Sequence, residues 1–167
     1  MADALILKAR PLTAAAFAAY GDVLEARGHA PEPMNQGWAQ RYRDLADVDV
    51  ADAGGRVGIS LVHSRADTMP VRLRLLERHP LGSQIFMPLS AHPFLVVVGV
   101  PGDVPARDQL EAFISDGRQG VNYHKGVWHH PMIALDAPSD FLIVDRSGPG
   151  NNCDESPIPG GDVEIWI

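Results

Sequence analysis

The sequence predicts a mainly β fold, a barrel with a short N-terminal helix and one further helix. After Gly54-Gly55, short apolar segments recur at fairly regular spacing and are separated by Pro, Gly, Ser and Asp, as in β sandwiches and barrels. The 167 residues are 46% apolar and 21% charged, which fits one folded globular domain in both length and composition. We therefore expect residues 1–167 to form a single domain around one core.

The N-terminal part is expected to contain a helix and then a loop. Thr13 can cap the exposed amides of a first helical turn, and the Ala-rich stretch after it predicts a short helix over residues 13–19, ending near Gly21. Residues 28–37 contain two prolines, two glycines and an asparagine, which favour irregular surface backbone. A loop of this kind is also a candidate flap over a site.

The remainder is expected to be strands with one helical interruption. Leu110, Phe113 and Ile114 lie at helical spacing after an Asp and before Gly117, which predicts the further helix over residues 108–115. Residues 148–161 are rich in Pro and Gly, and we expect a loop that leads to a final edge strand. The predicted strands span residues 57–62, 71–76, 83–88, 94–100, 121–123, 132–135, 141–145 and 163–166.

Charge and hydropathy exclude several classes of partner. The formal net charge is −7 and no block of Lys or Arg offsets it, so nucleic acid is not an expected partner. The longest apolar run, residues 94–100, is too short to span a bilayer, and the N-terminus lacks a basic segment followed by an apolar signal core. We expect no membrane association and a cytoplasmic location, with which the single cysteine, Cys153, is consistent.

The densest polar cluster is Gly120-Val-Asn-Tyr-His-Lys-Gly-Val-Trp-His-His-Pro131, which holds three of the seven histidines. Side chains alternate between faces in a strand, so Trp128 and His130 should point to one side and His129 to the other. Only one of the two adjacent histidines is then expected to face a barrel interior. The alternative is that the pair consists of a packed histidine and a surface histidine.

A second cluster, Glu77-Arg-His-Pro-Leu-Gly-Ser-Gln-Ile-Phe-Met-Pro88, predicts the end of one strand, a tight turn at residues 80–82 and the start of another strand. Its spacing resembles the first metal-binding motif of cupins, His-x-His followed after four residues by Glu. Residues 124–129 are similar to the second motif, Pro-x-Gly-x-x-His. Glu replaces the first His, Gln replaces the Glu, and His124 replaces the Pro. The resemblance implies a cupin-like double-stranded β-helix whose metal ligands are Glu77, His79, Gln84 and His129.

Imidazole and carboxylate groups suit a divalent transition ion such as nickel, zinc or manganese, with the Gln84 amide oxygen as a weak neutral ligand. The same residues could instead form a hydrogen-bonded network that binds a substrate directly. No organic cofactor is expected.

Longer stretches resemble a narrower family, the ureidoglycolate lyases. They are residues 77–84 and 120–131, Asp-Phe-Leu-Ile-Val-Asp-Arg at 140–146, Asn-Cys-Asp at 152–154, and the N-terminal Leu-Thr-Ala-Ala-Ala-Phe-Ala-Ala-Tyr-Gly-Asp-Val. The similarity covers nearly the whole chain and is weakest around residues 28–37 and 63–70. It implies a homodimeric lyase that cleaves (S)-ureidoglycolate into glyoxylate and urea during allantoin and purine degradation.

This reaction needs a group that removes the hydroxyl proton, a group that protonates the departing nitrogen, and a cation for the substrate carboxylate. His124 or His129 would be the base if a metal is bound, whereas Glu77 with His79 is the acid/base pair without one. Arg146 has the alternative role of a surface ion pair with Asp145. The candidate cations are Lys125, Arg146 and Arg41, and Tyr123, Phe86 and Trp128 are assigned to the pocket wall.

Three other functions stay open at this stage. A ureidoglycolate amidohydrolase would release ammonia and carbon dioxide rather than intact urea. A non-catalytic cupin would bind a small acid and report it to a partner. In a purely structural interpretation, the histidine cluster is packing alone.

Overall fold

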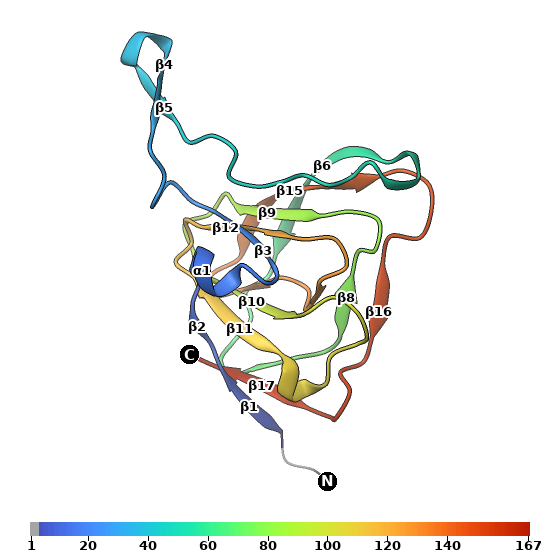
Figure 1. The fold of residues 1–167 in the computed structure, drawn as a ribbon. Helices are drawn as coiled ribbons and strands as arrows, with labels where there is room; N and C mark the ends of the chain where they lie inside the picture. Colours follow the sequence, from blue (N-terminus) through green and yellow to red (C-terminus); the bar gives the residue numbers. More distant parts are fainter. Residues whose placement is uncertain (1–3) are drawn as a thin grey trace.

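The computed structural model describes residues 4–167, and its core is formed by two mainly antiparallel sheets that face each other (Figure 1). One sheet has five strands in the order β3-β12-β9-β15-β6: β3 (Gly21–Leu24), β12 (Gly120–Tyr123), β9 (Gln84–Pro88), β15 (Ser139–Ser147) and β6 (Arg56–Ser64). The other has seven strands, and β14 pairs with β10 beside the order β16-β8-β13-β10-β11-β2. Its members are β16 (Asp154–Ser156), β8 (Leu76–Arg78), β13 (Trp128–His129), β10 (Phe94–Gly99), β14 (Ile133–Ala134), β11 (Glu111–Ser115) and β2 (Arg10–Pro11). The predicted mainly β fold is confirmed.

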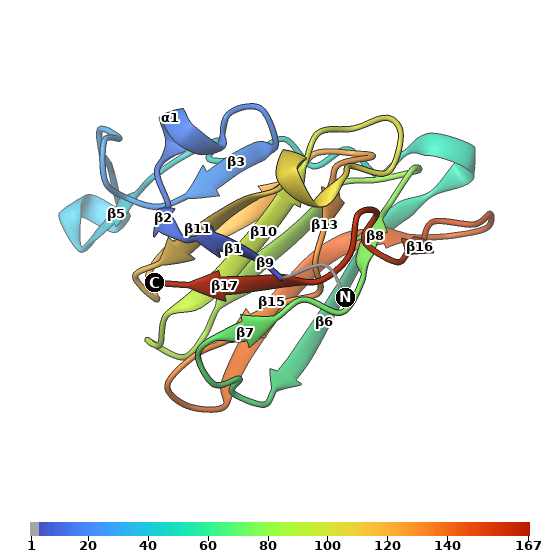
Figure 2. The same ribbon diagram turned by 90° about the horizontal axis from the view of Figure 1, so that it is seen from below.

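A third sheet covers the outer face of the seven-stranded sheet, as Figure 2 shows from below. Its order is β1-β17-β7, with β1 (Leu5–Lys8), β17 (Val163–Trp166) and β7 (Val71–Arg72). Strand β10 therefore has a core on each side. Phe94, Val96 and Val98 pack into the barrel interior, and Leu95 and Val97 pack toward the third sheet. This double burial explains why residues 94–99 are apolar without interruption.

The short N-terminal helix is confirmed as α1 (Ala14–Phe17), with the Thr13 hydroxyl accepting a hydrogen bond from the amide of Ala16 at 3.2 Å. Its Phe17 side chain is fully buried in the barrel core. No helix within residues 4–167 is long and apolar enough to cross a membrane.

The further helix predicted over residues 108–115 is wrong. A single 3-10 turn, η3 (Arg107–Gln109), leads directly into β11. Leu110 and Ala112 pack toward the third sheet while Phe113 packs into the barrel interior, so adjacent residues are buried on opposite faces. Because both faces of this strand are apolar, its pattern coincides with helical spacing.

Three other segments differ from the prediction. Residues 71–76 are not one strand, because β7 belongs to the third sheet and β8 to the seven-stranded sheet. The final strand β17 is not an edge, since β1 and β7 pair on its two sides. The predicted loop at 148–161 contains β16, and the predicted loop at 28–37 contains β4 (Glu32–Met34) and a 3-10 turn, η1 (Asn35–Gly37), before β5 (Ala39–Arg41).

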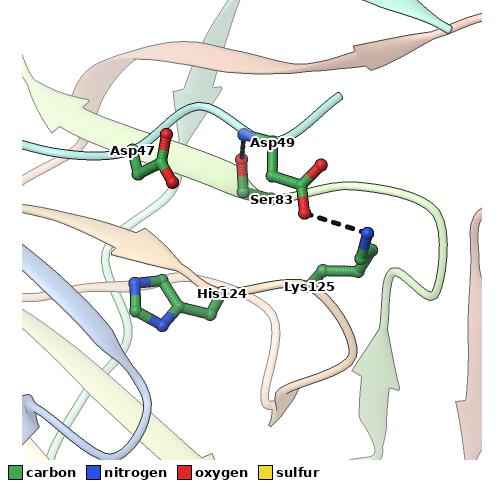
Figure 3. Close-up of a pocket in the computed structure, with 5 residues that line it drawn as sticks. All are labelled: Asp47, Asp49, Ser83, His124 and Lys125. Carbon is green, nitrogen blue, oxygen red and sulfur yellow. Dashed lines mark hydrogen bonds and ion pairs between the residues drawn. The ribbon is translucent and has the colours of Figure 1, made fainter. Parts of the chain in front are cut away.

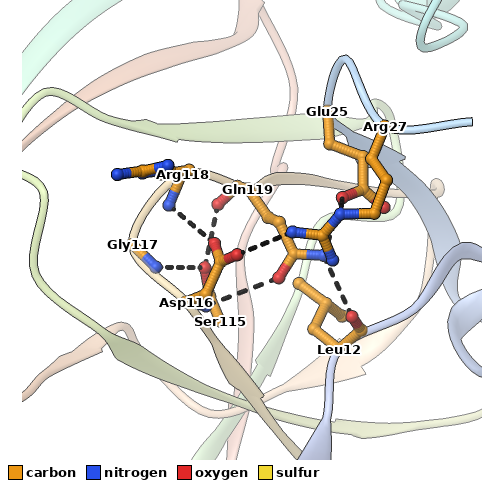
Figure 4. A network of polar contacts seen from close by, with 8 residues as sticks. All are labelled: Leu12, Glu25, Arg27, Ser115, Asp116, Gly117, Arg118 and Gln119. Atoms are coloured by element: carbon orange, nitrogen blue, oxygen red, sulfur yellow. Dashed lines mark hydrogen bonds and ion pairs between the residues drawn. The ribbon is translucent and has the colours of Figure 1, made fainter. Parts of the chain in front are cut away.

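The β4–β5 hairpin projects from the barrel, whereas the segments on either side of it are fastened (Figure 1). On its N-terminal side, Arg27 donates to Asp116 at 3.0 Å, and Gln119 donates to the Leu12 carbonyl at 3.0 Å and to Glu25 at 3.1 Å, in the network of Figure 4. On its C-terminal side, residues 44–55 cross the five-stranded sheet as a strap, which includes the 3-10 turn η2 (Asp52–Gly54).

Candidate active site

Two strand pairs bring the polar residues of the second cluster into the barrel interior. Glu77 on β8 lies directly opposite His129 on β13, in the seven-stranded sheet. Gln84 on β9 lies directly opposite Tyr123 on β12, in the five-stranded sheet. The turn predicted at residues 80–82 joins β8 to β9 and therefore crosses from one sheet to the other. We call Glu77, His79, Gln84, Tyr123 and His129 the interior group.

Both histidines of the interior group have one ring nitrogen held by the backbone. Nδ1 of His79 donates to the carbonyl of Asn152 at 2.7 Å, and Nδ1 of His129 donates to the carbonyl of Val127 at 3.0 Å. For His129 this bond assigns the tautomer in which Nε2 carries the lone pair, whereas both ring nitrogens of His79 face oxygen atoms, Nδ1 the Asn152 carbonyl and Nε2 the Gln84 amide oxygen. Nε2 of His129 is buried without a hydrogen-bond partner and lies 3.4 Å from a carboxylate oxygen of Glu77.

This arrangement fits a metal ion. One ligand atom each from Glu77, His79 and His129 lie within 4.8 Å of one another. Backbone carbonyls that fix Nδ1–H and aim Nε2 at a shared point are the outer-shell partners that metal-binding histidines use. The amide oxygen of Gln84 lies 3.1 Å from Nε2 of His79, so it is available as a neutral fourth ligand. Two imidazoles, a carboxylate and an amide oxygen suit a divalent transition ion.

Charge and burial set the protonation of the interior group. Burial raises the pKa of Glu77, but the nearby rings of His129, His79 and His130 outweigh burial and lower the pKa overall. Glu77 is therefore a carboxylate at neutral pH. Burial, together with the Glu77 charge, raises the pKa of Tyr123, whose neutral ring stacks on His129 with the ring centroids 4.2 Å apart.

The predicted alternation along residues 128–130 is confirmed, but His130 is not at the surface. Its Nε2 accepts from the amide of Arg74 at 3.1 Å, and its Nδ1 donates to the carbonyl of Pro131 at 2.6 Å. Burial lowers the pKa of His130 to about 4, so the ring is neutral. Trp128 packs in the core beneath the third sheet rather than beside the interior group, whereas Phe86 lies in the barrel core.

His124 and Lys125 line a separate pocket of about 270 Å³ with Asp47, Asp49 and Ser83 (Figure 3). Nε2 of His124 lies 3.1 Å from Asp22, and the Lys125 ammonium donates to Asp49 at 2.9 Å and to Asp52 at 2.8 Å. Hydrogen bonds to Asp52 and Asp49 raise the pKa of Lys125. None of these partners belongs to the interior group. The structure thus divides the residues predicted to act together into two sets.

The structure brings neither candidate arginine to the interior group. Arg146 is buried, and its guanidinium donates to the carbonyls of Asp52, Ala53 and Pro149, so the predicted surface ion pair with Asp145 is wrong. Arg41 lies on the projecting hairpin and pairs with Glu32 at 3.2 Å.

Three further residues lie beside the interior group that the sequence argument did not assign to it. Asp145 accepts a hydrogen bond from the Gln84 amide at 3.3 Å. Ligand atoms of Cys153 and Glu155 lie within 4.8 Å of one from Glu77. The alternation Phe141, Ile143, Asp145 along a predicted strand was the signal that Asp145 faces inward. Cys153 and Glu155 gave no such signal, because their segment was predicted as a loop.

A family model and individual relatives of known sequence agree on one family. A family model described as ureidoglycolate lyase matches residues 4–164. A ureidoglycolate lyase of Pseudomonas paraeruginosa is 53% identical over 149 residues, which are 89% of this chain and 88% of that protein. One from Burkholderia mallei is 51% identical over 161 residues, 96% of this chain and 92% of that protein.

Solved structures show a weaker likeness. The rmlC epimerase of Mycobacterium tuberculosis has a TM-score of 0.45 at 18% identity, covering 78% of this chain and 69% of that one. RmlC from Streptococcus suis has a TM-score of 0.46 at 13% identity, covering 89% of this chain and 74% of that one.

Proposed function

The chain belongs to the ureidoglycolate lyase family and is a lyase, and from this we propose that it cleaves (S)-ureidoglycolate into glyoxylate and urea within allantoin and purine degradation. The observation that supports a reaction in the barrel interior is the unpartnered Nε2 of His129, buried and facing Glu77 at 3.4 Å. We further propose a cytoplasmic homodimer, as the family resemblance implies.

The interior group supports a metal-assisted reaction. Glu77, His79 and His129 would hold a divalent ion, nickel, zinc or manganese, with the Gln84 oxygen as a fourth ligand. When bound, the ion supplies a positive charge that polarises an oxygen of the substrate. Tyr123 supports the His129 ring by stacking on it, and the backbone carbonyls of Asn152 and Val127 fix both imidazoles.

The proton transfer then falls to a group that is free of the ligand set. Cleavage removes the proton from the carbinol hydroxyl, turns that carbon into the aldehyde of glyoxylate, and breaks the carbon–nitrogen bond, whose electron pair and a proton go to the urea nitrogen. The Asp145 side chain lies next to Gln84, and its backbone pairs opposite Gly58 on β6. We assign it as the base that takes the hydroxyl proton and returns it to the nitrogen. His124 faces the surface pocket instead, which does not favour that role for it.

The products distinguish this function from the amidohydrolase. We expect purified protein to release one urea per glyoxylate, with ammonia appearing only after urease is added. Ammonia formed without urease would contradict the lyase proposal. If ureidoglycolate binds but disappears no faster than in buffer, even after nickel, zinc or manganese is added, the chain is a small-acid-binding protein instead.

A further inference from the structure

Within the described part of the chain, β4 and β5 make their main contacts with each other and with their own turn η1. We call residues 30–43 the arm. None of them is buried, and Trp38 at the tip is 90% exposed. Strands β4 and β5 pair only with each other, in the register Glu32 to Arg41 through Met34 to Ala39. Figure 1 shows the arm extending away from the barrel.

An arm of this kind needs a surface to pack on in order to be stable. A lone two-stranded hairpin is marginally stable in water unless it packs on something. Both of its ends are nevertheless fixed to the barrel, by Arg27 on Asp116 at 3.0 Å on one side (Figure 4) and by the paired backbones of Asp49 and Ser83 at 2.8 Å on the other. The barrel therefore holds the arm away from its own surface and leaves the Trp38 side chain exposed to solvent or to another molecule.

The same chain carries an apolar surface that nothing in residues 4–167 covers. Val57, Ile59 and Leu61 alternate along β6 and are 48%, 71% and 72% exposed. Strand β6 pairs with β15 on one side only, so its other edge is open. We call these three residues the apolar strip. They are the surface on which an aromatic arm can be buried.

The charge of the arm is complementary to that of the interior site, which favours contact with the site of another copy. The chain has a net charge of −7, but the arm holds two arginines, Arg41 and Arg43, and one glutamate, Glu32. The interior group contains the Glu77 carboxyl group, Asp145 lies beside Gln84, and the exposed Glu155 lies near Glu77. Asp145 is opposite Gly58, which lies between Val57 and Ile59, so the apolar strip and the interior site are at one level of β6 on its two faces.

Within residues 4–167, two of the cations predicted for the substrate carboxylate are engaged outside the interior group. Arg146 is engaged by backbone carbonyls and Lys125 by Asp49 and Asp52. Arg41 is the more readily released of the two arm arginines. It makes one bond to Glu32 at 3.2 Å, whereas Arg43 bonds both oxygens of that carboxylate and would still neutralise it.

We propose that the arm packs on a second copy of this chain, with Trp38 against the apolar strip and Arg41 reaching that copy's interior site, where it binds the substrate carboxylate. The exchange is symmetric, so each of the two sites is completed by the other copy. Each exchanged Trp38 side chain would bury about 150–250 Å² of apolar surface. This inference rests on the proposed function, because it assigns the ligand of Arg41.

Mixing two inactive variants tests the exchange. Arg41→Ala removes the arm cation, and Glu77→Gln disables the interior site. Each alone is expected to lose most turnover of ureidoglycolate. After subunits are exchanged in equal amounts, turnover should return to about one quarter of wild type, because half of the dimers are mixed and each holds one complete site. If Arg41 acts within its own chain, no mixed dimer holds a complete site and turnover stays at the average of the two variants.

Sedimentation tests the surface independently of turnover. The wild-type chain should be dimeric and Trp38→Asp should shift it toward monomer, while Arg65→Ala, an exposed arginine outside the arm, should change neither assembly nor turnover. A monomeric wild type, an unshifted Trp38→Asp variant or absent recovery on mixing would overturn the inference. If wild type releases no urea, the proposed function fails, and sedimentation still decides whether the arm is an interface.

Discussion

His130 is a buried residue next to the interior group whose role is structural. Its ring accepts from the Arg74 amide and donates to the Pro131 carbonyl, so both nitrogens are satisfied only in the neutral form. Its neighbour His129 has one satisfied nitrogen and one free one. Adjacent histidines thus differ in their hydrogen bonding because the strand directs them to opposite faces, an alternation that the sequence predicted.

The lowered pKa of His130 predicts a pH dependence of stability. Its pKa is about 4 in the folded state against about 6.5 in an unfolded chain, so the unfolded state binds the extra proton between these values. The free energy of unfolding should therefore fall as the pH drops from about 6.5 toward 4, by an amount on the order of 3 kcal/mol. Denaturant unfolding of wild type and His130→Gln at several pH values measures it. The variant should show a shallower slope in this window, and an equal slope in both proteins would exclude His130 as the cause.

Among the elements, strands with alternating residues or clear turn residues at their ends were the easiest to predict from sequence. Residues 57–62, 83–88 and 141–145 alternate or carry turn residues at their ends, and they correspond to β6, β9 and β15. The prediction for the β11 segment was wrong because both faces of this strand are buried, so the spacing of its apolar residues did not distinguish a strand from a helix. Strands β1, β3 and β16 are three or four residues long and are defined by pairing with distant strands, which no local pattern records.

The position of the strap over residues 44–55 depends on hydrogen bonds from the Arg146 guanidinium. Arg146→Lys keeps the charge but loses the planar fork that bonds the carbonyls of Asp52, Ala53 and Pro149. We expect the free energy of unfolding to decrease by about 1–3 kcal/mol, with KM for ureidoglycolate unchanged at temperatures where the variant is folded. Arg118→Lys, at an exposed position, is the matched control. A large rise in KM without loss of stability would instead assign Arg146 to the substrate carboxylate.

At the scale of the whole molecule, the barrel joins residues that are distant in sequence. The motif spacing placed Glu77, His79, Gln84 and His129 in one set, and the structure brings these four together because β8 pairs with β13 and continues into β9. Motif spacing did not predict that His124 and Lys125 would line another pocket. Asp47 and Asp49 of the strap also line that pocket, so it depends on where the strap crosses the sheet. The positions of Arg41 and the arm depend on a second chain in our proposal, so one chain's sequence did not specify them.

The central claim is that the barrel interior, and not the surface pocket, carries the reaction, and one comparison of turnover tests it most directly. Rates of urea release are measured for Glu77→Gln and His124→Asn beside wild type, with circular dichroism and thermal unfolding to show that each is folded. We predict that Glu77→Gln lowers kcat by about 10³-fold or more, whereas His124→Asn stays within about threefold of wild type, since only the first removes a group that contacts the reacting substrate or its metal. A folded His124→Asn variant that loses turnover while Glu77→Gln retains it would contradict the account.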